Sequence, residues 1–173
     1  MMSQVSKRAF AAAFGVALLS SQALFAEEAT VKEVDVDVEI QAAEGSNALN
    51  FYPNVEDDLK RAVVAKLPVE DDPNGYVVDV VLQKISLDGD TVLPDSMEFN
   101  QMEGVIVITS PLTGAAPQSV PVKLAAESAD GLVPEGYVAV TPSTDDFYAA
   151  MVETFASVVA ERVPEFMRDS ASK

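Results

Sequence analysis

The first clear pattern in the chain is an alternation of apolar and acidic residues between Thr30 and Gln41. The apolar positions share one parity: Val34, Val36, Val38 and Ile40. The acidic positions share the other: Glu33, Asp35, Asp37 and Glu39. Because successive side chains of a strand point to opposite faces, this pattern predicts a half-buried strand with an acidic outer face.

A four-residue repeat of apolar side chains follows, and it predicts an amphipathic helix from an Asn54 cap to about Leu67, stopped by Pro68. The repeat consists of Val55, Leu59, Val63 and Leu67. Such spacing places one narrow apolar stripe along a helix.

Three further segments predict strands: Tyr76 to Leu87, Gly104 to Ser110 and Ser119 to Glu127. The first two carry apolar residues on both parities, which is typical of central strands. Pro121 favours an edge position for the third strand, because proline cannot donate a ladder hydrogen bond. The segment Thr91 to Asn100 is ambiguous, and Tyr137 to Val140 allows a short additional strand.

The second predicted helix starts at a capping box formed by Ser143 and Asp146, and ends at Pro164. Its wide apolar stripe consists of Tyr148, Met151, Val152, Phe155, Val158, Val159 and Val163. Residues 165–173 are expected to form a polar C-terminal tail.

The element order β-α-β-β-β-α predicts an α+β fold, an α/β sandwich with both helices on one face of a mainly antiparallel four-stranded sheet. Residues 27–164 would form this single domain. The opposite sheet face would then carry Val77, Val81 and Ile85, and an uncovered apolar patch of this kind often marks an interface. The alternative is that residues 91–100, or the loop near Leu132, fold over the patch.

The first 26 residues predict a signal peptide. Lys7 and Arg8 precede an apolar run from Phe10 to Leu19, which is too short to span a membrane. We expect cleavage after Ala26, with Ala23 as the alternative. The mature chain is therefore expected in the periplasm or, alternatively, outside the cell, without a transmembrane segment.

The amino-acid composition excludes several classes of site chemistry. The 173 residues include 28 acidic and 11 basic side chains, for a net charge of −17, with no histidine, cysteine or tryptophan. The chain thus has no imidazole base, no thiol and no disulfide. Binding to nucleic acid or anionic lipid is disfavoured, because both require a basic surface. We expect no cofactor and no enzymatic activity; a hydrolase with a carboxylate pair is the residual catalytic hypothesis.

Two acidic features have a functional and a structural interpretation. Asp88 and Asp90, which flank Gly89, are weak calcium-ligand candidates, although the spacing favours a hairpin turn. The acidic row Glu33, Asp35, Asp37 and Glu39 could bind calcium or meet a basic partner. As a solvated strand face, the same row would discourage edge-to-edge aggregation.

The export signal, the element order and the Thr113-Gly114 turn before a long C-terminal helix resemble small cell-envelope accessory proteins: LPS-assembly lipoproteins and the auxiliary lipoproteins of ABC-type transporters. Those lipoproteins use an acylated cysteine, which this chain lacks. The resemblance implies a noncatalytic partner of a larger envelope complex. The apolar patch predicts that the chain acts through protein contacts, with a stable protein partner or as a homo-oligomer. The alternative is a soluble acidic binder of a cation or a basic ligand.

Overall fold

The computed structural model describes residues 30–40, 45–111, 115–126, 131–140 and 147–171, with side chains described as far as Arg168. The predicted signal peptide, the Ser143–Asp146 capping box and the Thr113-Gly114 turn lie outside these ranges. The elements are β1 (Val31–Val38), α1 (Ala48–Phe51), α2 (Val55–Val64), β2 (Tyr76–Ser86), β3 (Gln101–Thr109), β4 (Gln118–Ala126), β5 (Val138–Val140) and α3 (Phe147–Ala171).

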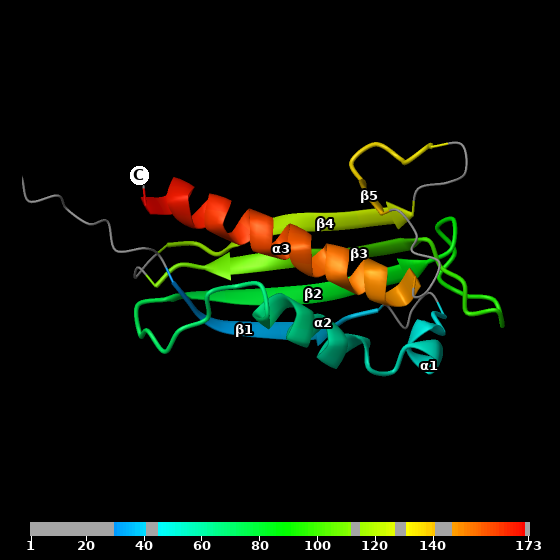
Figure 1. Cartoon of the computed structure of the whole chain (residues 1–173), viewed down its shortest axis with the longest axis horizontal. Helices are drawn as coiled ribbons and strands as arrows, with labels where there is room; N and C mark the ends of the chain where they lie inside the picture. Colours follow the sequence, from blue (N-terminus) through cyan, green and yellow to red (C-terminus); the bar gives the residue numbers. More distant parts are fainter. Residues whose placement is uncertain (1–29, 41–44, 112–114, 127–130, 141–146, 172–173) are drawn as a thin grey trace, which may run out of the picture.

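The strands form one five-stranded mixed sheet in the order β1-β2-β3-β4-β5 (Figure 1). The inner pairs β2-β3 and β3-β4 are antiparallel, whereas the outer pairs β1-β2 and β4-β5 are parallel. The α+β class is therefore confirmed, but the prediction of a mainly antiparallel four-stranded sheet is wrong. The prediction failed at β5, because three residues are too few to show a reliable alternation of apolar and polar side chains.

Helices α2 and α3 lie side by side on one face of the sheet, as predicted (Figure 1). The α2 stripe Val55, Leu59 and Val63 is completely buried. The helix itself ends at Val64, and a turn connects it to Pro68. Asn54 occupies the cap position, but its side chain makes no capping hydrogen bond, so the predicted role of that side chain is wrong.

The predicted end of α3 is also wrong, because the helix continues through Pro164 to Ala171. A proline inside a helix costs about 3 kcal/mol, since it removes a hydrogen bond and crowds the preceding turn. The extra turns bury Met167 and place Phe166 edge-on to Tyr76, with ring centroids 6.4 Å apart. Each buried apolar side chain contributes about 1.5–3 kcal/mol, which offsets the proline. Residues 165–171 are thus helix, and Phe166 and Met167 pack against the core.

Gly104 lets α3 approach the sheet closely. A Cβ atom at this position would lie 2.5 Å from the Val81 carbonyl oxygen and 2.9 Å from Cζ of Phe155. Both distances are too short for non-bonded contacts, so the position requires glycine. The Phe155 ring, which is 0% exposed, lies directly over the backbone of β3.

A bulge at Gln83 changes which residues of β2 point toward the helices. The pairing with β3 shifts between Leu82 and Lys84, so Gln83 is an extra residue without a partner. An extra residue reverses which parity points to the helices. Before the bulge the buried residues are even-numbered, and after it Ile85 is the residue that faces the core.

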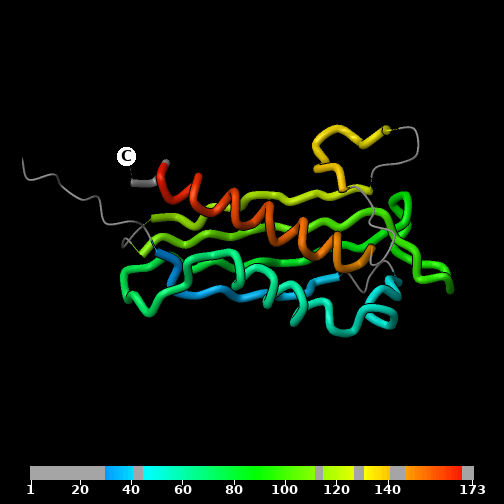
Figure 2. The backbone as a smooth tube through the Cα atoms, viewed as in Figure 1, coloured from blue at the N-terminus to red at the C-terminus, as the bar shows by residue number. Residues whose placement is uncertain are grey.

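The connection between β2 and β3 begins with the tight turn that the sequence favoured at Asp88-Gly89. Leu87 and Asp90 exchange two backbone hydrogen bonds of 2.9 Å, and both central residues have positive φ. The chain then extends to the end of the molecule where α1 lies (Figure 2). There the Asn47 amide hydrogen-bonds both backbone groups of Leu93, at 2.8 and 2.7 Å, which fixes the connection against α1.

The free edge of β1 is partly capped by its own neighbours. Val31 forms an isolated bridge with Val69, and the Glu70 amide donates to the Val31 carbonyl at 2.9 Å. Farther along, the Val36 amide donates to the Asp35 carboxylate at 3.1 Å. On the other side, β5 pairs only with Leu124–Ala126 of β4.

Candidate functional site: the outer sheet face

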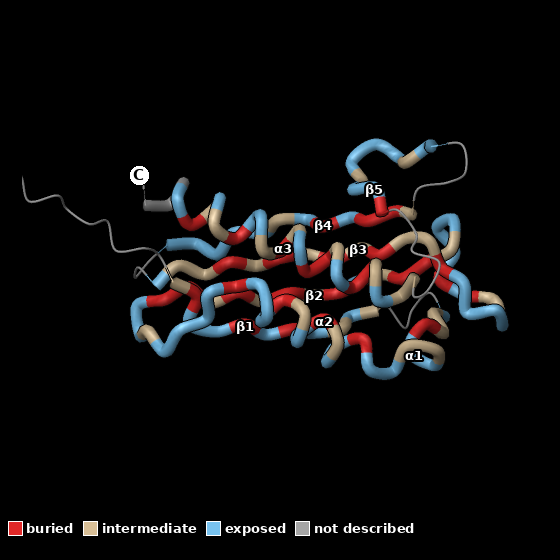
Figure 3. Tube along the Cα trace, in the orientation of Figure 1, coloured by how far each residue is buried: buried red, intermediate tan, exposed pale blue. Residues whose placement is uncertain are grey.

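The sheet has one face turned away from α2 and α3, which we call the outer face. According to the register, the outer face includes Glu33, Asp35, Asp37, Val77, Asp79, Val81, Lys84, Glu103, Val105, Val107, Ser119, Pro121 and Lys123. Burial alternates along β2 and β3, with completely buried residues toward the helices and half-buried residues on the outer face (Figure 3).

Two of the three predicted interface residues lie on the outer face. Val77 and Val81 are half-buried there, and Val105 and Val107 of β3 lie beside them. Ile85 is 0% exposed and belongs to the core, so its predicted place on the outer face is wrong. The reason is the Gln83 bulge, which a parity count along the sequence does not reveal.

Two segments, residues 91–100 and the loop near Leu132, were expected as alternative covers of the apolar patch, and they pack in different places. The connection 91–100 packs at the helical side, where Leu93 and Phe99 are buried in the core. The loop after β4 reaches one end of the outer face through Tyr137, whereas its Leu132 is 70% exposed. The valine patch formed by Val77, Val81, Val105 and Val107 remains half-exposed.

The acidic row of β1 borders this patch, with Glu33, Asp35, Asp37 and Glu39 all exposed. Lys60 of α2 reaches the Asp35 carboxylate, with Nζ 2.8 Å from Oδ1. This hydrogen bond, together with the Val36 amide and the charge of Lys60, lowers the pKa of Asp35. Lys60 thus compensates one member of the row.

Asp79 is an acidic side chain in the middle of the apolar patch. It lies between Val77 and Val81 along β2, and directly opposite Asp35 and Val107 on the neighbouring strands. Burial raises the pKa of Asp79, and the negative charges of Asp35, Asp37 and Glu33 raise it further. The sequence reasoning missed Asp79, although a single acid within an otherwise apolar strand was a visible signal.

The far end of the outer face carries a compact polar cluster. Lys84 and Lys123 flank Glu103, each with Nζ 3.5 Å from a carboxylate oxygen. The Tyr137 hydroxyl donates to Glu103 at 2.9 Å, and Lys123 lies 5.5 Å from the centre of the Tyr137 ring. Burial, and then the bond to Glu103, raises the pKa of Tyr137. The two lysines thus share the single carboxylate of Glu103.

The other acidic candidates, Asp88 and Asp90, form hydrogen bonds within their own turn and the segment next to it. Asp88 accepts a hydrogen bond from the Asn100 amide at 2.7 Å, and Asp90 accepts one from the Val92 backbone at 3.0 Å. Within the described ranges, no group of three acidic residues could hold a metal ion. The geometry therefore gives Asp88 and Asp90 a turn-forming role.

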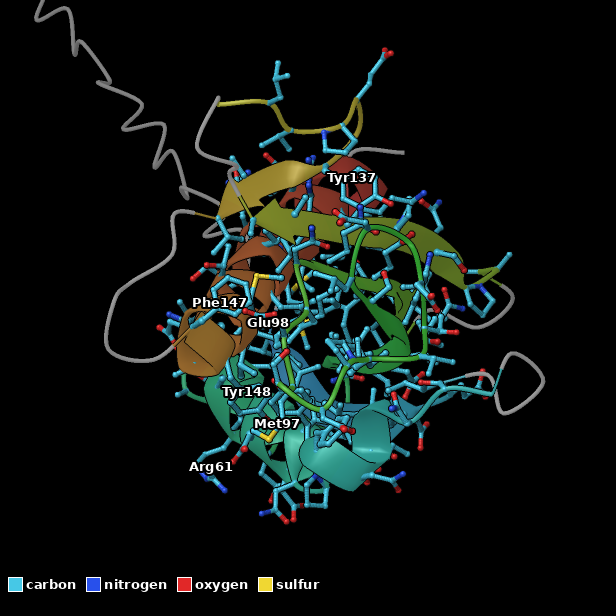
Figure 4. The ribbon with its side chains drawn as sticks, turned by 90° about the vertical axis from the view of Figure 1, so that its right-hand side faces the viewer. Arg61, Met97, Glu98, Tyr137, Phe147 and Tyr148 are labelled. Carbon is cyan, nitrogen blue, oxygen red and sulfur yellow. The ribbon has the colours of Figure 1, made fainter. Side chains whose placement is uncertain are left out.

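An aromatic cluster closes the end of the helical layer, where Phe147 and Tyr148 start α3 (Figure 4). The Tyr52 and Tyr148 rings stack with centroids 4.9 Å apart, and Phe99 meets both Tyr52 and Phe147 edge-on. The Tyr148 hydroxyl donates to Asp58 at 2.9 Å. These rings join the α1–α2 connection, α3 and the β2–β3 connection, and Tyr148 reaches α2 through Asp58, so the cluster serves packing.

No family model and no curated protein matches the chain. Among solved structures, the chain is similar to rare lipoprotein B from Shewanella oneidensis, at 10% identity and a TM-score of 0.31, over 82% of this chain and 97% of that one. In the described residues, no helix combines the length and apolarity needed to cross a bilayer.

Proposed function

We propose that this chain is an exported, noncatalytic accessory protein of the bacterial cell envelope, and that it acts through protein–protein contacts made by the outer face. The observation that carries the proposal is the valine patch on a face that neither α2 nor α3 covers. Apolar patches on the surface of a folded domain are typical of interaction sites.

The carboxylates of the outer face favour binding over catalysis. Carboxylate-dependent hydrolysis requires two carboxyl groups that flank a substrate bond. Asp79 and Asp35 instead lie side by side on neighbouring strands of the sheet, and Asp35 forms an ion pair with Lys60. The proposed export rests on the N-terminal pattern of Lys7, Arg8 and the apolar run after them.

The test is Val81→Asp in the full chain, expressed in its native host. A second carboxylate beside Asp79 should abolish complex formation, because it replaces an apolar side chain of the patch and adds a charge that the contact would have to bury. Val64→Asp is the matched control, since Val64 is 41% exposed on α2 at the other face. Melting temperature verifies folding, and light scattering with co-purification reports assembly. If Val81→Asp leaves folding, oligomeric state and co-purifying proteins unchanged, the proposed contact face is wrong.

A further inference from the structure

We infer that the partner of the outer face is a second protein whose docking segment is both apolar and basic, and which places a lysine or arginine beside Asp79. This inference rests on the proposed function and specifies the chemistry of the partner. It follows from the register of the outer face, from its charges and from the cations that are already engaged.

The register arranges the outer face in rows across the strands. One row runs Asp35, Asp79, Val107 and Ser119, and the next runs Asp37, Val81, Val105 and Pro121. Neighbouring strands lie about 4.8 Å apart, and diagonal neighbours about 7–8 Å. The carboxylates of Asp35, Asp37 and Asp79 therefore gather on the β1–β2 side, and the valines on the β2–β3 side.

The cations near these rows have other partners. Lys60 pairs with Asp35, while Lys84 and Lys123 both pair with Glu103. Within the described residues, neither Asp79 nor Asp37 takes part in an ion pair. Asp79 opposes a like charge on the neighbouring strand, which is an unfavourable arrangement in a sheet. A cation supplied by a bound partner would relieve this arrangement.

The distribution of charge on the outer face favours one class of partner over the others. Anionic lipid and nucleic acid would meet the acidic row, which repels them. A second copy of this chain, whose net charge is −17, would bring its own acidic excess to the contact. A segment of a different protein fits better. Its apolar residues would pack against the valines, and one or two basic residues would pair with the carboxylates.

Asp79 should consequently affect stability and binding in opposite directions. In the free protein its charge is unfavourable, so Asp79→Asn should raise the melting temperature. In the complex the same charge receives a cation, so Asp79→Asn should weaken binding about tenfold, which corresponds to roughly 1.4 kcal/mol. A purely structural role for Asp79 would change the melting temperature alone.

The experiment places a photo-crosslinking amino acid at Val107 in the full chain, expressed in its native host, and identifies the captured peptide by mass spectrometry. The same probe at Ser157, which is exposed on α3, gives the background. Each probe is combined with Asp79→Asn or with Asp57→Asn, where Asp57 is an exposed carboxylate of α2. We expect capture from Val107 of a peptide of another protein that contains lysine or arginine among apolar residues. Asp79→Asn should lower this yield about tenfold, and Asp57→Asn should leave it unchanged.

The contrary outcomes separate the two proposals. Capture from Val107 at the Ser157 background would overturn the contact face, and the inference with it. Capture of this chain itself, or of a peptide without basic residues, would leave the contact face and overturn the inference. A yield that Asp79→Asn does not change, in a variant with an equal or higher melting temperature, would also overturn the inference.

Discussion

The two faces of the sheet are built from the same strands, and both carry valines in the central strands β2 and β3, yet only one face is covered by helices. On the helical face, Val80, Ile106 and Ile108 are 0% exposed beneath α2 and α3. On the outer face, their immediate neighbours Val81 and Val107 remain half-exposed, with Asp79 among them. The difference shows that apolar content alone does not identify a core, because covering elements must also be present.

The largest effect is expected from Phe155→Ala. Removal of a completely buried aromatic ring destabilises a protein by about 3–5 kcal/mol, and the close approach at Gly104 leaves little room for compensation. Val158→Ala, on a half-buried position of the same helix, is the control and should cost much less. Urea denaturation measures the free energy of unfolding of both variants, and equal losses would contradict the complete burial of Phe155.

A smaller effect distinguishes two adjacent valines of β2. Val80→Ala should cost about 2 kcal/mol, from the lost methyl groups and the cavity that remains. Val81→Ala should cost clearly less, because its side chain is already half-exposed. The comparison uses chemically identical changes on opposite faces. Similar free energies of unfolding for the two variants would mean that the outer face is covered after all.

Asp79→Asn should stabilise the isolated protein slightly, by roughly 0.2–1 kcal/mol at neutral pH. Because folding raises the pKa of Asp79, the native state binds the proton more tightly than the unfolded chain does. The cost of its charge is therefore fully present above the folded pKa and disappears as pH falls below the unfolded value. Unfolding curves from neutral to acidic pH should show the gain shrink with acidification. A gain independent of pH would exclude the charge as its cause.

The smallest effect is expected from Lys60→Met, which keeps the apolar stem but removes the cation. The pKa of Asp35 should rise, since Lys60 is its main source of depression. The stability contributed by this depression is present above the unfolded pKa and is lost as pH falls through the folded one. Carboxyl NMR titration measures the change, with Asp72 as the control because its lowered pKa depends on Asn74 and Thr30. An unchanged Asp35 pKa would contradict the ion pair.

The sequence predicted those parts of the fold that follow from local periodicity. The alternation in β1 and the stripe of α2 place their valines and leucines correctly, because one face of each element is buried and the other exposed. Prediction failed where a long-range contact outweighs a local preference. Pro164 favours a helix end, but Met167 and Phe166 gain burial only beyond it.

The outer face was predictable in outline only. Val77 and Val81 follow from simple parity, whereas Ile85 does not, because the extra residue Gln83 appears only when β2 is paired with β3. Asp79 became significant for a similar reason. Its opposition to Asp35 depends on the parallel pairing of β1 and β2, which the sequence does not encode locally.

The partial capping of β1 has a consequence for how copies of the protein behave at high concentration. Fibre growth by strand addition needs a long edge with unpaired backbone groups. Along β1, Val69 pairs with Val31 and the Asp35 carboxylate occupies the Val36 amide, and on β4 Pro121 offers no amide proton. These features oppose strand addition at the edges of the sheet, and the proposed contact through the outer face would instead give a finite complex.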